Sequence, residues 1–295
     1  MGILEGKAVV VTGAGRGLGE AYAVHAAYAG AAVVVNDVDE DLAVRVAENI
    51  RRHGGRAVSS GHSVANAGEA GQIVELCVEQ FGALDGLVNN AGINYEALPW
   101  DEDPDQMREL IEINVLGAMY VGTAAMRVMA GRGGGTIVNA CSGASFGQRK
   151  LGAYAGSKGA IASLTYSWAL DAEDVGIRVN AVCPLAHTRM VWTSERSLRN
   201  CPPSRTPSKI APLVVFLLSD AAAGITGQLV RCNGTQLHIV GQPFIKTPVL
   251  ERGHWDTASV QRAFDEVFVT NLEPYGLEKR MPPKLRRLLA PLETA

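Results

Sequence analysis

Apolar residues along the chain gather in short runs rich in valine, isoleucine and alanine, separated by longer stretches with helical periodicity. Such runs predict buried strands, and they lie at residues 7–12, 32–36, 56–60, 85–89, 135–141, 177–182 and 228–232. The stretches between them predict helices near residues 17–30, 39–53, 66–81, 103–131, 152–175 and 208–219. This alternation indicates an α/β fold, a single doubly wound (Rossmann) domain with a seven-stranded parallel sheet covered on both faces.

Two segments interrupt the alternation. Residues 185–210 are loop-like and rich in proline, and they leave the end of the sixth predicted strand, where a loop over a substrate would begin. Residues 240–295 show no strand–helix repeat but contain the aromatic side chains Phe244, Trp255, Phe264, Phe268 and Tyr275. So many aromatics argue against a frayed end. We therefore expect a domain over residues 1–239 and a C-terminal extension over 240–295 that packs on the domain or on a neighbouring subunit.

A glycine-rich turn, TGAGRGLG, follows the first strand and opens an alanine-rich helix. The residues of interest in it are Gly13, Arg16, Gly17, Leu18 and Gly19. Its glycines permit a tight turn, a close approach of backbone to a pyrophosphate, and close packing of helix on strand. Asp37 ends the second strand, eighteen residues after the last of these glycines, where a carboxylate can accept from both hydroxyls of an adenosine ribose. The pattern predicts a bound dinucleotide.

The charges beside this turn bear on which dinucleotide binds. Arg16 could pair with the 2′-phosphate of NADP, whereas Asp37 would stand beside that phosphate and repel it. Because a carboxylate at the ribose favours the unphosphorylated cofactor, we expect NAD, with NADP the less favoured alternative.

Tyr154 and Lys158 stand four residues apart in GAYAGSKGAIASL, a stretch small and apolar enough to be helical. Side chains at this spacing leave the same face of a helix. A phenol with a pKa of about 10 is a poor acid or base at neutral pH. A nearby ammonium favours the phenolate and lowers that pKa, so the pair is a candidate proton donor and acceptor.

Composition narrows the choice of partners. The 295 residues are 47% apolar with a net charge of −3, enough for one large α/β domain with a sizeable core. Lysines and arginines are scattered, which argues against nucleic acid, and no apolar stretch approaches the roughly 18 residues that cross a bilayer. Without a signal-peptide pattern we expect a cytoplasmic protein. The six histidines and five scattered cysteines show no metal-ligand spacing or disulfide framework, so no metal is expected.

Further motifs follow the later strands. With NNAG at residues 89–92, Asn114 within INVLG, Ser142 after the fifth strand and the tyrosine–lysine pair, the chain resembles the short-chain dehydrogenase/reductase family over roughly residues 5–235. The resemblance implies hydride transfer between a nicotinamide cofactor and a small-molecule secondary alcohol or ketone. It also implies cofactor contacts from Ser63, Val64, Asn90, Ala91, Gly92, Tyr154, Lys158, Pro184 and Thr188.

The reaction needs donors for charge that develops on the substrate oxygen as a ketone is reduced. The resemblance makes Tyr154 the proton donor and Ser142 a hydrogen-bond donor to the same oxygen. Lys158 would lower the pKa of Tyr154 and hold the nicotinamide ribose, and Asn114 would hold a water linking Lys158 to solvent. The plainer interpretation of Asn114 is a helix-bending residue bonded to its own backbone.

The spacing of the serine departs from the family pattern. Ser142 lies twelve residues before Tyr154, where the family usually has thirteen, and Cys141 occupies the thirteenth position. Alignment of the strand IVNACS favours Ser142, with one deletion in the loop that follows. Cys141 and Ser145 are the alternatives, although a thiol is a weaker hydrogen-bond donor to an oxyanion.

Two other departures bear on the substrate. Leu185 follows Pro184 where the family usually has glycine, and Ser63 with Val64 stand where an aspartate usually contacts adenine. These features resemble the (3R)-hydroxyacyl-CoA dehydrogenase units of multifunctional β-oxidation enzymes and their free-standing bacterial relatives. An acyl-CoA would need cations near the cleft, for which the loops offer Arg149, Lys150, Arg189, Arg196 and Arg199. The alternative is an alicyclic or steroid-like alcohol in an apolar slot lined by Leu151, Met190 and Trp192.

Other classes of function also fit the predicted fold, namely a non-catalytic dinucleotide-binding protein and an epimerase or dehydratase. Retention of all four candidate catalytic side chains favours the dehydrogenase. Helices 103–131 and 152–175 carry many small residues that permit close packing, and the family commonly pairs these helices between subunits. We therefore expect a homotetramer, with a homodimer as the alternative.

Overall fold

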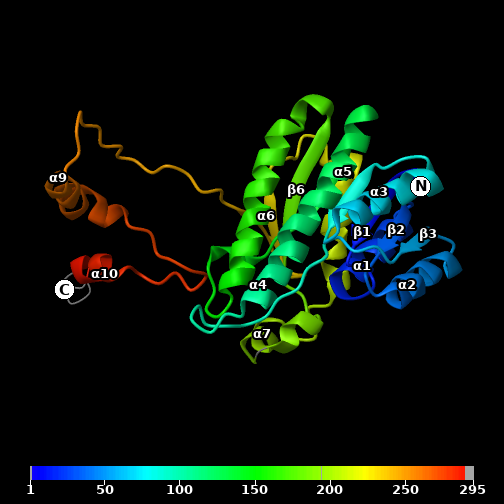
Figure 1. Cartoon of the computed structure of the whole chain (residues 1–295), viewed down its shortest axis with the longest axis horizontal. Coiled ribbons are helices and arrows are strands. Elements are labelled where there is room, and N and C mark those ends of the chain that lie inside the picture. The colour runs from blue at the N-terminus through cyan, green and yellow to red at the C-terminus, as the bar shows by residue number, and fades with distance from the viewer. Residues whose placement is uncertain (1, 194, 290–295) are drawn as a thin grey trace.

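A single twisted sheet forms the centre of the computed structural model, which describes residues 2–193 and 195–289. Its strands are β1 (Ala8–Thr12), β2 (Ala32–Asn36), β3 (Arg56–Ser60), β4 (Gly86–Asn89), β5 (Gly135–Ala140), β6 (Ile177–Pro184), β7 (Leu229–Cys232) and β8 (Leu237–Val240). They lie in the order β3-β2-β1-β4-β5-β6-β7-β8. The first seven run parallel, which confirms the predicted doubly wound α/β fold (Figure 1).

The eighth strand corrects the expectation of a seven-stranded sheet. β8 pairs antiparallel with β7 at the edge of the sheet, with His238 opposite Arg231. Leu237 and Ile239 of this strand are 63% and 67% exposed, so it lies at the surface although three of its four residues are apolar. The hairpin turn begins at Asn233, whose side chain accepts from the amides of Thr235 and Gln236. An Asn-Gly pair in this turn is a hairpin signal that was available in the sequence.

Helices cover both faces of the sheet and create two halves of the core. On one face lie α1 (Gly17–Tyr28), α2 (Glu40–Arg52) and α8 (Ala211–Leu218). On the other lie α3 (Ala67–Phe81), α5 (Ala118–Gly131) and α6 (Gly152–Asp171). The strand order reverses between β1 and β4, so a crevice opens at the carboxyl ends of the central strands, where this fold binds its ligands.

The predicted helix 103–131 is continuous but not regular. It consists of α4 (Pro104–Ile111), a π-helical turn (Glu112–Gly117) and α5. Among the described residues, this stretch is long and apolar enough by composition to span a bilayer, with a mean hydropathy of 1.3 and 33% of its most apolar window buried. The expectation that no stretch approaches such a length was therefore wrong. In this fold its apolar side chains belong to the helix layer that packs against α3.

The substrate loop predicted at residues 185–210 is also more ordered than expected. It contains a 3₁₀ turn (Arg189–Thr193) and the short helix α7 (Glu195–Asn200). His187 helps to fold the loop back on itself, because its amide donates to the carbonyl of Arg205 at 2.7 Å and its Nδ1 lies 2.7 Å from the carbonyl oxygen of Cys201.

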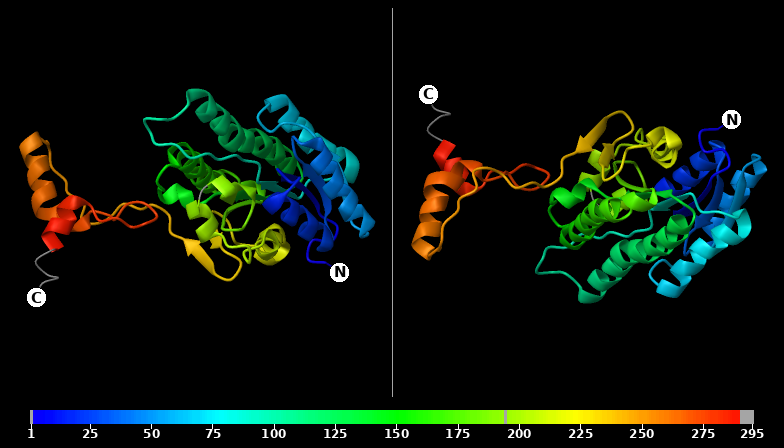
Figure 2. Two further views of the ribbon diagram at one scale, coloured as in Figure 1. Left: turned by 90° about the horizontal axis from the view of Figure 1, so that it is seen from below. Right: turned by 90° about the horizontal axis from the view of Figure 1, so that it is seen from above.

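The C-terminal extension leaves the body of the molecule after β8. Its helices α9 (Thr257–Arg262) and α10 (Pro283–Leu289) stand away from the sheet in all views (Figures 1 and 2). Between them the chain returns to the body, where the amide of Leu277 donates to the carbonyl of Gly147 at 2.7 Å. The extension is thus folded, yet within its own chain it touches the sheet domain chiefly at this tip.

Candidate functional site

Two adjoining cavities lie at the carboxyl ends of the strands. The larger, of about 750 Å³, is lined by twelve of the fifteen residues predicted to contact a dinucleotide, namely Gly13, Arg16, Gly17, Leu18, Gly19, Asp37, Ser63, Val64, Asn90, Ala91, Gly92 and Thr188. Of the other three, Tyr154 and Pro184 line the smaller cavity and Lys158 lines neither. The smaller, of about 600 Å³, is lined by Ser142, Tyr154 and Pro184 among others. The two share Leu18, Asn94, Thr188 and Met190. A ligand in the larger cavity would therefore reach the wall of the smaller one.

The glycine turn has the conformation that its sequence demands. Gly17 has a φ of +62°, a left-handed conformation that favours glycine. A Cβ on Gly19 would lie 2.1 Å from the carbonyl oxygen of Gly13, so no larger residue fits there. Asn90 fixes the turn from the neighbouring strand, because its Nδ2 donates to the carbonyls of Thr12 and Gly13 at 3.0 Å. Backbone amides at the start of α1 are left to face the larger cavity.

Asp37 closes the far end of this cavity and is 8% exposed. One oxygen of its carboxylate accepts from the amide of Gly15 at 2.9 Å and the other accepts from the amide of Asp39 at 3.1 Å. Each oxygen keeps a further lone pair for a hydroxyl donor. Arg16 lies nearby, with Nη2 at 4.0 Å from the carboxylate of Asp39. The arginine is thus partly neutralised by a second acidic residue.

Lys158 lies beneath the smaller cavity and is 5% exposed. Its Nζ donates to the carbonyl of Ala140 at 2.7 Å and lies 5.8 Å from the ring centroid of Tyr154. Burial lowers the pKa of Lys158. Burial also raises the pKa of Tyr154 to about 12, and the hydroxyl of Ser142 opposes that rise. Burial therefore dominates the pKa of Tyr154, and the expected lowering by the lysine is not seen.

Asn114 occupies the π-helical turn and is 1% exposed. Its Oδ1 accepts from the amide of Ile93 at 2.8 Å, and its Nδ2 donates to the carbonyl of Ile93 and to Oγ of Ser157. The plainer interpretation, an asparagine bonded to its own helix, is therefore wrong. Asn114 ties the loop after β4 to α6, and Gly92 in that loop lies close to both Asn114 and Lys158. π-Helical turns of this kind often mark functional sites.

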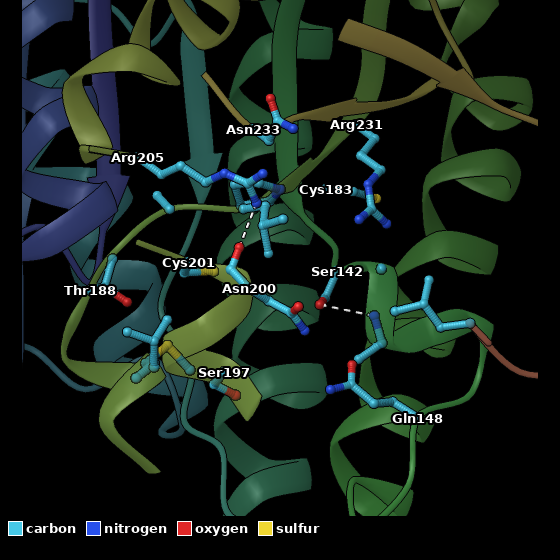
Figure 3. Close-up of a pocket in the computed structure, with 18 of the residues that line it drawn as sticks. Ser142, Gln148, Cys183, Thr188, Ser197, Asn200, Cys201, Arg205, Arg231 and Asn233 are labelled. Atoms are coloured by element: carbon cyan, nitrogen blue, oxygen red, sulfur yellow. Dashed lines mark hydrogen bonds between the residues drawn. The ribbon is translucent and has the colours of Figure 1, made fainter. Parts of the chain in front are cut away.

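Ser142 follows β5 and faces the smaller cavity (Figure 3). Its Oγ accepts from the amide of Ala144 at 3.1 Å, which leaves the hydroxyl proton for another acceptor. Cys141 also reaches this cavity, but it is 3% exposed and its thiol lies 3.2 Å from the carbonyl oxygen of Lys158. Ser145 does not line the cavity and donates to the carbonyl of Ser142 at 2.7 Å. The geometry thus favours Ser142 over both alternatives.

The cations proposed for an acyl-CoA are dispersed. Arg199 lines the smaller cavity and Arg189 the larger one, whereas Arg149 and Lys150 line neither. The side chains of Arg196 and Trp192 lie outside the described residues. Leu151 and Met190 do line the smaller cavity, as expected of apolar walls. No group of three potential metal-ligating side chains comes together within the described ranges.

Several polar residues of the smaller cavity were not anticipated, among them Gln148, Arg205, Arg231 and His238. Arg231 could have been found from the sequence, because it is a charged residue inside the apolar run of a predicted buried strand. Charged side chains are rarely buried unless they have a partner or a ligand. His238 lies on the strand after the Asn-Gly turn, so the hairpin signal could have placed it beside Arg231. Gln148 had no such signal, because the loop that carries it follows no regular pattern.

Comparison with known proteins identifies these features with one family. The model of the short chain dehydrogenase family matches residues 7–198. The chain is 36% identical to 2-(S)-hydroxypropyl-CoM dehydrogenase 3 of Xanthobacter autotrophicus, over 78% of this chain and 96% of the relative. It is 37% identical to cis-4-hydroxycyclohexanecarboxylate dehydrogenase of Sinomonas cyclohexanicum, over 77% of this chain and 95% of the relative.

Solved structures agree. A short chain dehydrogenase from Mycobacterium avium superposes with a TM-score of 0.81 at 30% identity, covering 96% of this chain and 98% of its own. A gluconate 5-dehydrogenase from Burkholderia cenocepacia in complex with NADP and tartrate gives 0.72 at 31% identity, over 78% and 95%. A 7α-hydroxysteroid dehydrogenase with NADH and 7-oxo glycochenodeoxycholic acid gives 0.71 at 31%, over 79% and 94%.

Because Ser142 and not Cys141 offers a free hydroxyl proton to the cavity, we expect substitutions of the two residues to lower kcat by very different amounts. Ser142→Ala removes the hydroxyl beside Tyr154 and should lower kcat by about 10²- to 10³-fold, the usual cost of losing one donor to a developing oxyanion. Cys141→Ser keeps a small polar side chain at a position that is nearly buried and should change kcat less than about fivefold. Both rates are measured from NADH absorbance. A larger loss in Cys141→Ser than in Ser142→Ala would assign the role to the cysteine.

Proposed function

The chain belongs to the short-chain dehydrogenase family, and on that premise we propose that it interconverts a bulky secondary alcohol and its ketone with NAD. It is an NAD(P)-dependent oxidoreductase acting on CH–OH groups. The observation that carries the finer proposal is that Ser142 and Tyr154 meet in a cavity that shares its wall with the cavity of the glycine turn.

The larger cavity fits a nicotinamide dinucleotide. The left-handed Gly17 and the close-packed Gly19 leave room for phosphates over the start of α1. Asp37 offers acceptors for ribose hydroxyls at the far end. When bound, this cofactor supplies the hydride donor or acceptor for the alcohol–ketone pair.

Side chains of the protein supply the proton that the ketone oxygen takes up during reduction. With a pKa of about 12, Tyr154 is protonated at neutral pH and ready to donate to the oxygen of a ketone. Ser142 donates a hydrogen bond to the same oxygen and favours its anionic form. The carbonyl of Ala140 fixes the amine of Lys158 beside the ring of Tyr154. Asn114 fixes the loop after β4 to Ser157, which precedes that lysine on α6.

Turnover of a panel of cyclic and linear secondary alcohols and ketones, followed by NADH absorbance, tests this function. We expect net cofactor turnover, and Tyr154→Phe should lower it by about 10²- to 10⁴-fold. Alcohol oxidation should speed up as pH rises, because it needs the phenolate, and ketone reduction should not. Conversion of substrate without net change in NADH would indicate an epimerase or dehydratase. Binding of NADH with no conversion would indicate a non-catalytic protein.

The choice of NAD over NADP rests on Asp37. Its two oxygens already accept amide hydrogens, so the carboxylate is held where a 2′-phosphate would have to lie. Arg16 is the candidate partner for that phosphate, but its Nη2 lies 4.0 Å from the carboxylate of Asp39. Since solved relatives carry NADH in one case and NADP in another, the family alone does not decide.

Asp37→Ala should lower the ratio of kcat/KM for NADH to kcat/KM for NADPH by about 10- to 100-fold, because one repulsive contact with the 2′-phosphate is removed. The preference for NADH should then shrink or reverse. Asp41→Ala is the matched control, since it deletes one exposed carboxylate at the start of α2 and should leave the ratio unchanged. A wild-type preference for NADPH would overturn the proposal.

A ring-bearing alcohol fits the smaller cavity better than an acyl-CoA does. Leu151 and Met190 give it apolar walls, and two of the four proposed phosphate-binding cations with described side chains lie off both cavities. The matched proteins include a hydroxycyclohexanecarboxylate dehydrogenase and a hydroxysteroid dehydrogenase, both named for ring substrates. The (3R)-hydroxyacyl-CoA is therefore the second candidate.

Five free, buried cysteines suit the reducing cytoplasm, where we place the reaction.

We also propose a homotetramer, or failing that a homodimer. Gly117 and Gly122 pack inside the chain, against Val64 and Trp168, but Gly156 and Gly159 on α6 face open space. Apolar side chains on the extension are widely exposed, with Phe244 79%, Ile245 88% and Val249 72% accessible. Surfaces of this kind mark protein contacts. The extension would then pack on a neighbouring subunit.

Light scattering should give a mass near four times 31.2 kDa. Gly159→Arg should reduce that mass while the circular dichroism spectrum is kept, because the new side chain enters open space within its own chain. Gly71→Arg on α3, a glycine equally free of neighbours, is the control and should keep the wild-type mass. A wild-type mass near that of one chain would refute the assembly.

A further inference from the structure

The smaller cavity carries an unbalanced charge. Three arginines line it, Arg199, Arg205 and Arg231, and no aspartate or glutamate is among the described residues of its wall. Arg199 is exposed, whereas Arg205 and Arg231 are half-buried. A half-buried guanidinium loses hydration, which is costly unless a carboxylate or another acceptor replaces the water. The cavity is therefore built to receive negative charge or strong hydrogen-bond acceptors.

Two of the three arginines already have partners. Arg199 lies 3.4 Å from the carboxylate of Glu195, one turn away on α7. Arg205 donates to the carbonyl of Asn200 at 2.5 Å, and Figure 3 shows this bond across the cavity wall. Arg231 has neither: its guanidinium makes no hydrogen bond or ion pair with the residues that the structure describes. Figure 3 shows the side chain of Arg231 pointing into the cavity, without a hydrogen bond to the other residues drawn.

The position of Arg231 is set by the sheet. It lies on β7 in register with Cys183 of β6 and opposite His238 of β8, and all three line the same cavity. Cross-strand partners present their side chains on the same face of a sheet. The imidazole of His238 is therefore available as a second polar group beside the guanidinium.

Gly143 brings this cation next to the reacting centre. A Cβ at residue 143 would lie 2.5 Å from Nη1 of Arg231, so only glycine leaves room for the guanidinium in this position. Gly143 directly follows Ser142, whose hydroxyl faces the same cavity as Tyr154. A molecule with its alcohol at Ser142 and Tyr154 can therefore extend toward Arg231 within one cavity of about 600 Å³.

Given the proposed alcohol–ketone chemistry, we propose that Arg231 binds an anionic group of the substrate, a carboxylate, and thereby selects hydroxy or oxo acids over neutral alcohols. A guanidinium holds a carboxylate through two parallel hydrogen bonds, which fixes orientation as well as charge. Arg231 is a specificity-determining residue in this scheme. It takes no part in the transfer of the hydride or the proton.

Binding without turnover tests the assignment. Calorimetry on the NADH-bound enzyme compares cyclohexanecarboxylate with cyclohexanecarboxamide, which has the same shape but no charge. We expect the carboxylate to bind about 10- to 100-fold more tightly, as for a hydrogen-bonded ion pair shielded from water. Arg231→Gln should abolish the difference, and Arg231→Lys, which keeps the charge but loses the fork, should keep part of it.

Arg132→Gln is the matched control, because it removes one exposed arginine at the end of α5, next to the start of β5 and so at the opposite end of the sheet from the cavity. It should retain the wild-type preference. Equal binding of the two probes by the wild type, or a preference that survives in Arg231→Gln, would overturn the proposal. So would an equal loss of preference in Arg132→Gln, since the effect would then be one of net charge.

The outcome separates this inference from the function on which it rests. If the carboxylate is preferred through Arg231 but no alcohol or ketone is turned over, the anion site stands and the dehydrogenase proposal fails. If 4-oxocyclohexanecarboxylate and its ethyl ester are reduced with equal kcat/KM, the dehydrogenase stands and the anion site fails.

Discussion

The hydrogen bonds of Asn90 to the carbonyls of Thr12 and Gly13 are the constraint on which the rest of the site depends. They join the end of β4 to the turn after β1, at the place where the strand order reverses. Thr12 returns the contact, because its Oγ1 accepts from the amides of Asn90 and Ala91. Without this cross-link the glycine turn and the loop under it would move independently, and neither cavity would have a fixed wall.

The same site shows two effects of burial acting in opposite directions. Desolvation lowers the pKa of Lys158 and raises that of Tyr154, so each group is pushed toward its neutral form. A neutral tyrosine is the form that can donate a proton. Release of that proton leaves a buried phenolate, and desolvation is the largest part of its cost. The hydroxyl of Ser142 offsets part of that cost through its hydrogen bond to the phenol.

Local patterns predicted the features that short segments determine by themselves. The seven parallel strands follow from apolar runs, and the glycine turn follows from its spacing, because both depend on residues within about ten positions of one another. β8 and Arg231 were missed for a different reason. β8 is short and buries little of its own surface, and Arg231 gains its position beside the reacting centre only because Gly143, in the turn after β5, leaves space for it. The preference for Ser142 over Cys141 and Ser145 came from the alignment of its strand, and the cavity then gave a physical reason for it, because Ser145 does not line the wall and the thiol of Cys141 lies against the carbonyl of Lys158.

The extension links the outer surface of the molecule to the interior of the smaller cavity. Leu277 lines that cavity and donates its amide to the carbonyl of Gly147, in the loop that carries Ser142 toward α6. The helices on either side of this tip, α9 and α10, stand clear of the sheet domain. Leu277 is thus held at the cavity by its hydrogen bond to Gly147 and not by packing of α9 and α10 on the sheet domain. If the proposed homotetramer forms through these two helices, the same subunit contact would also bear on one side of the substrate cavity.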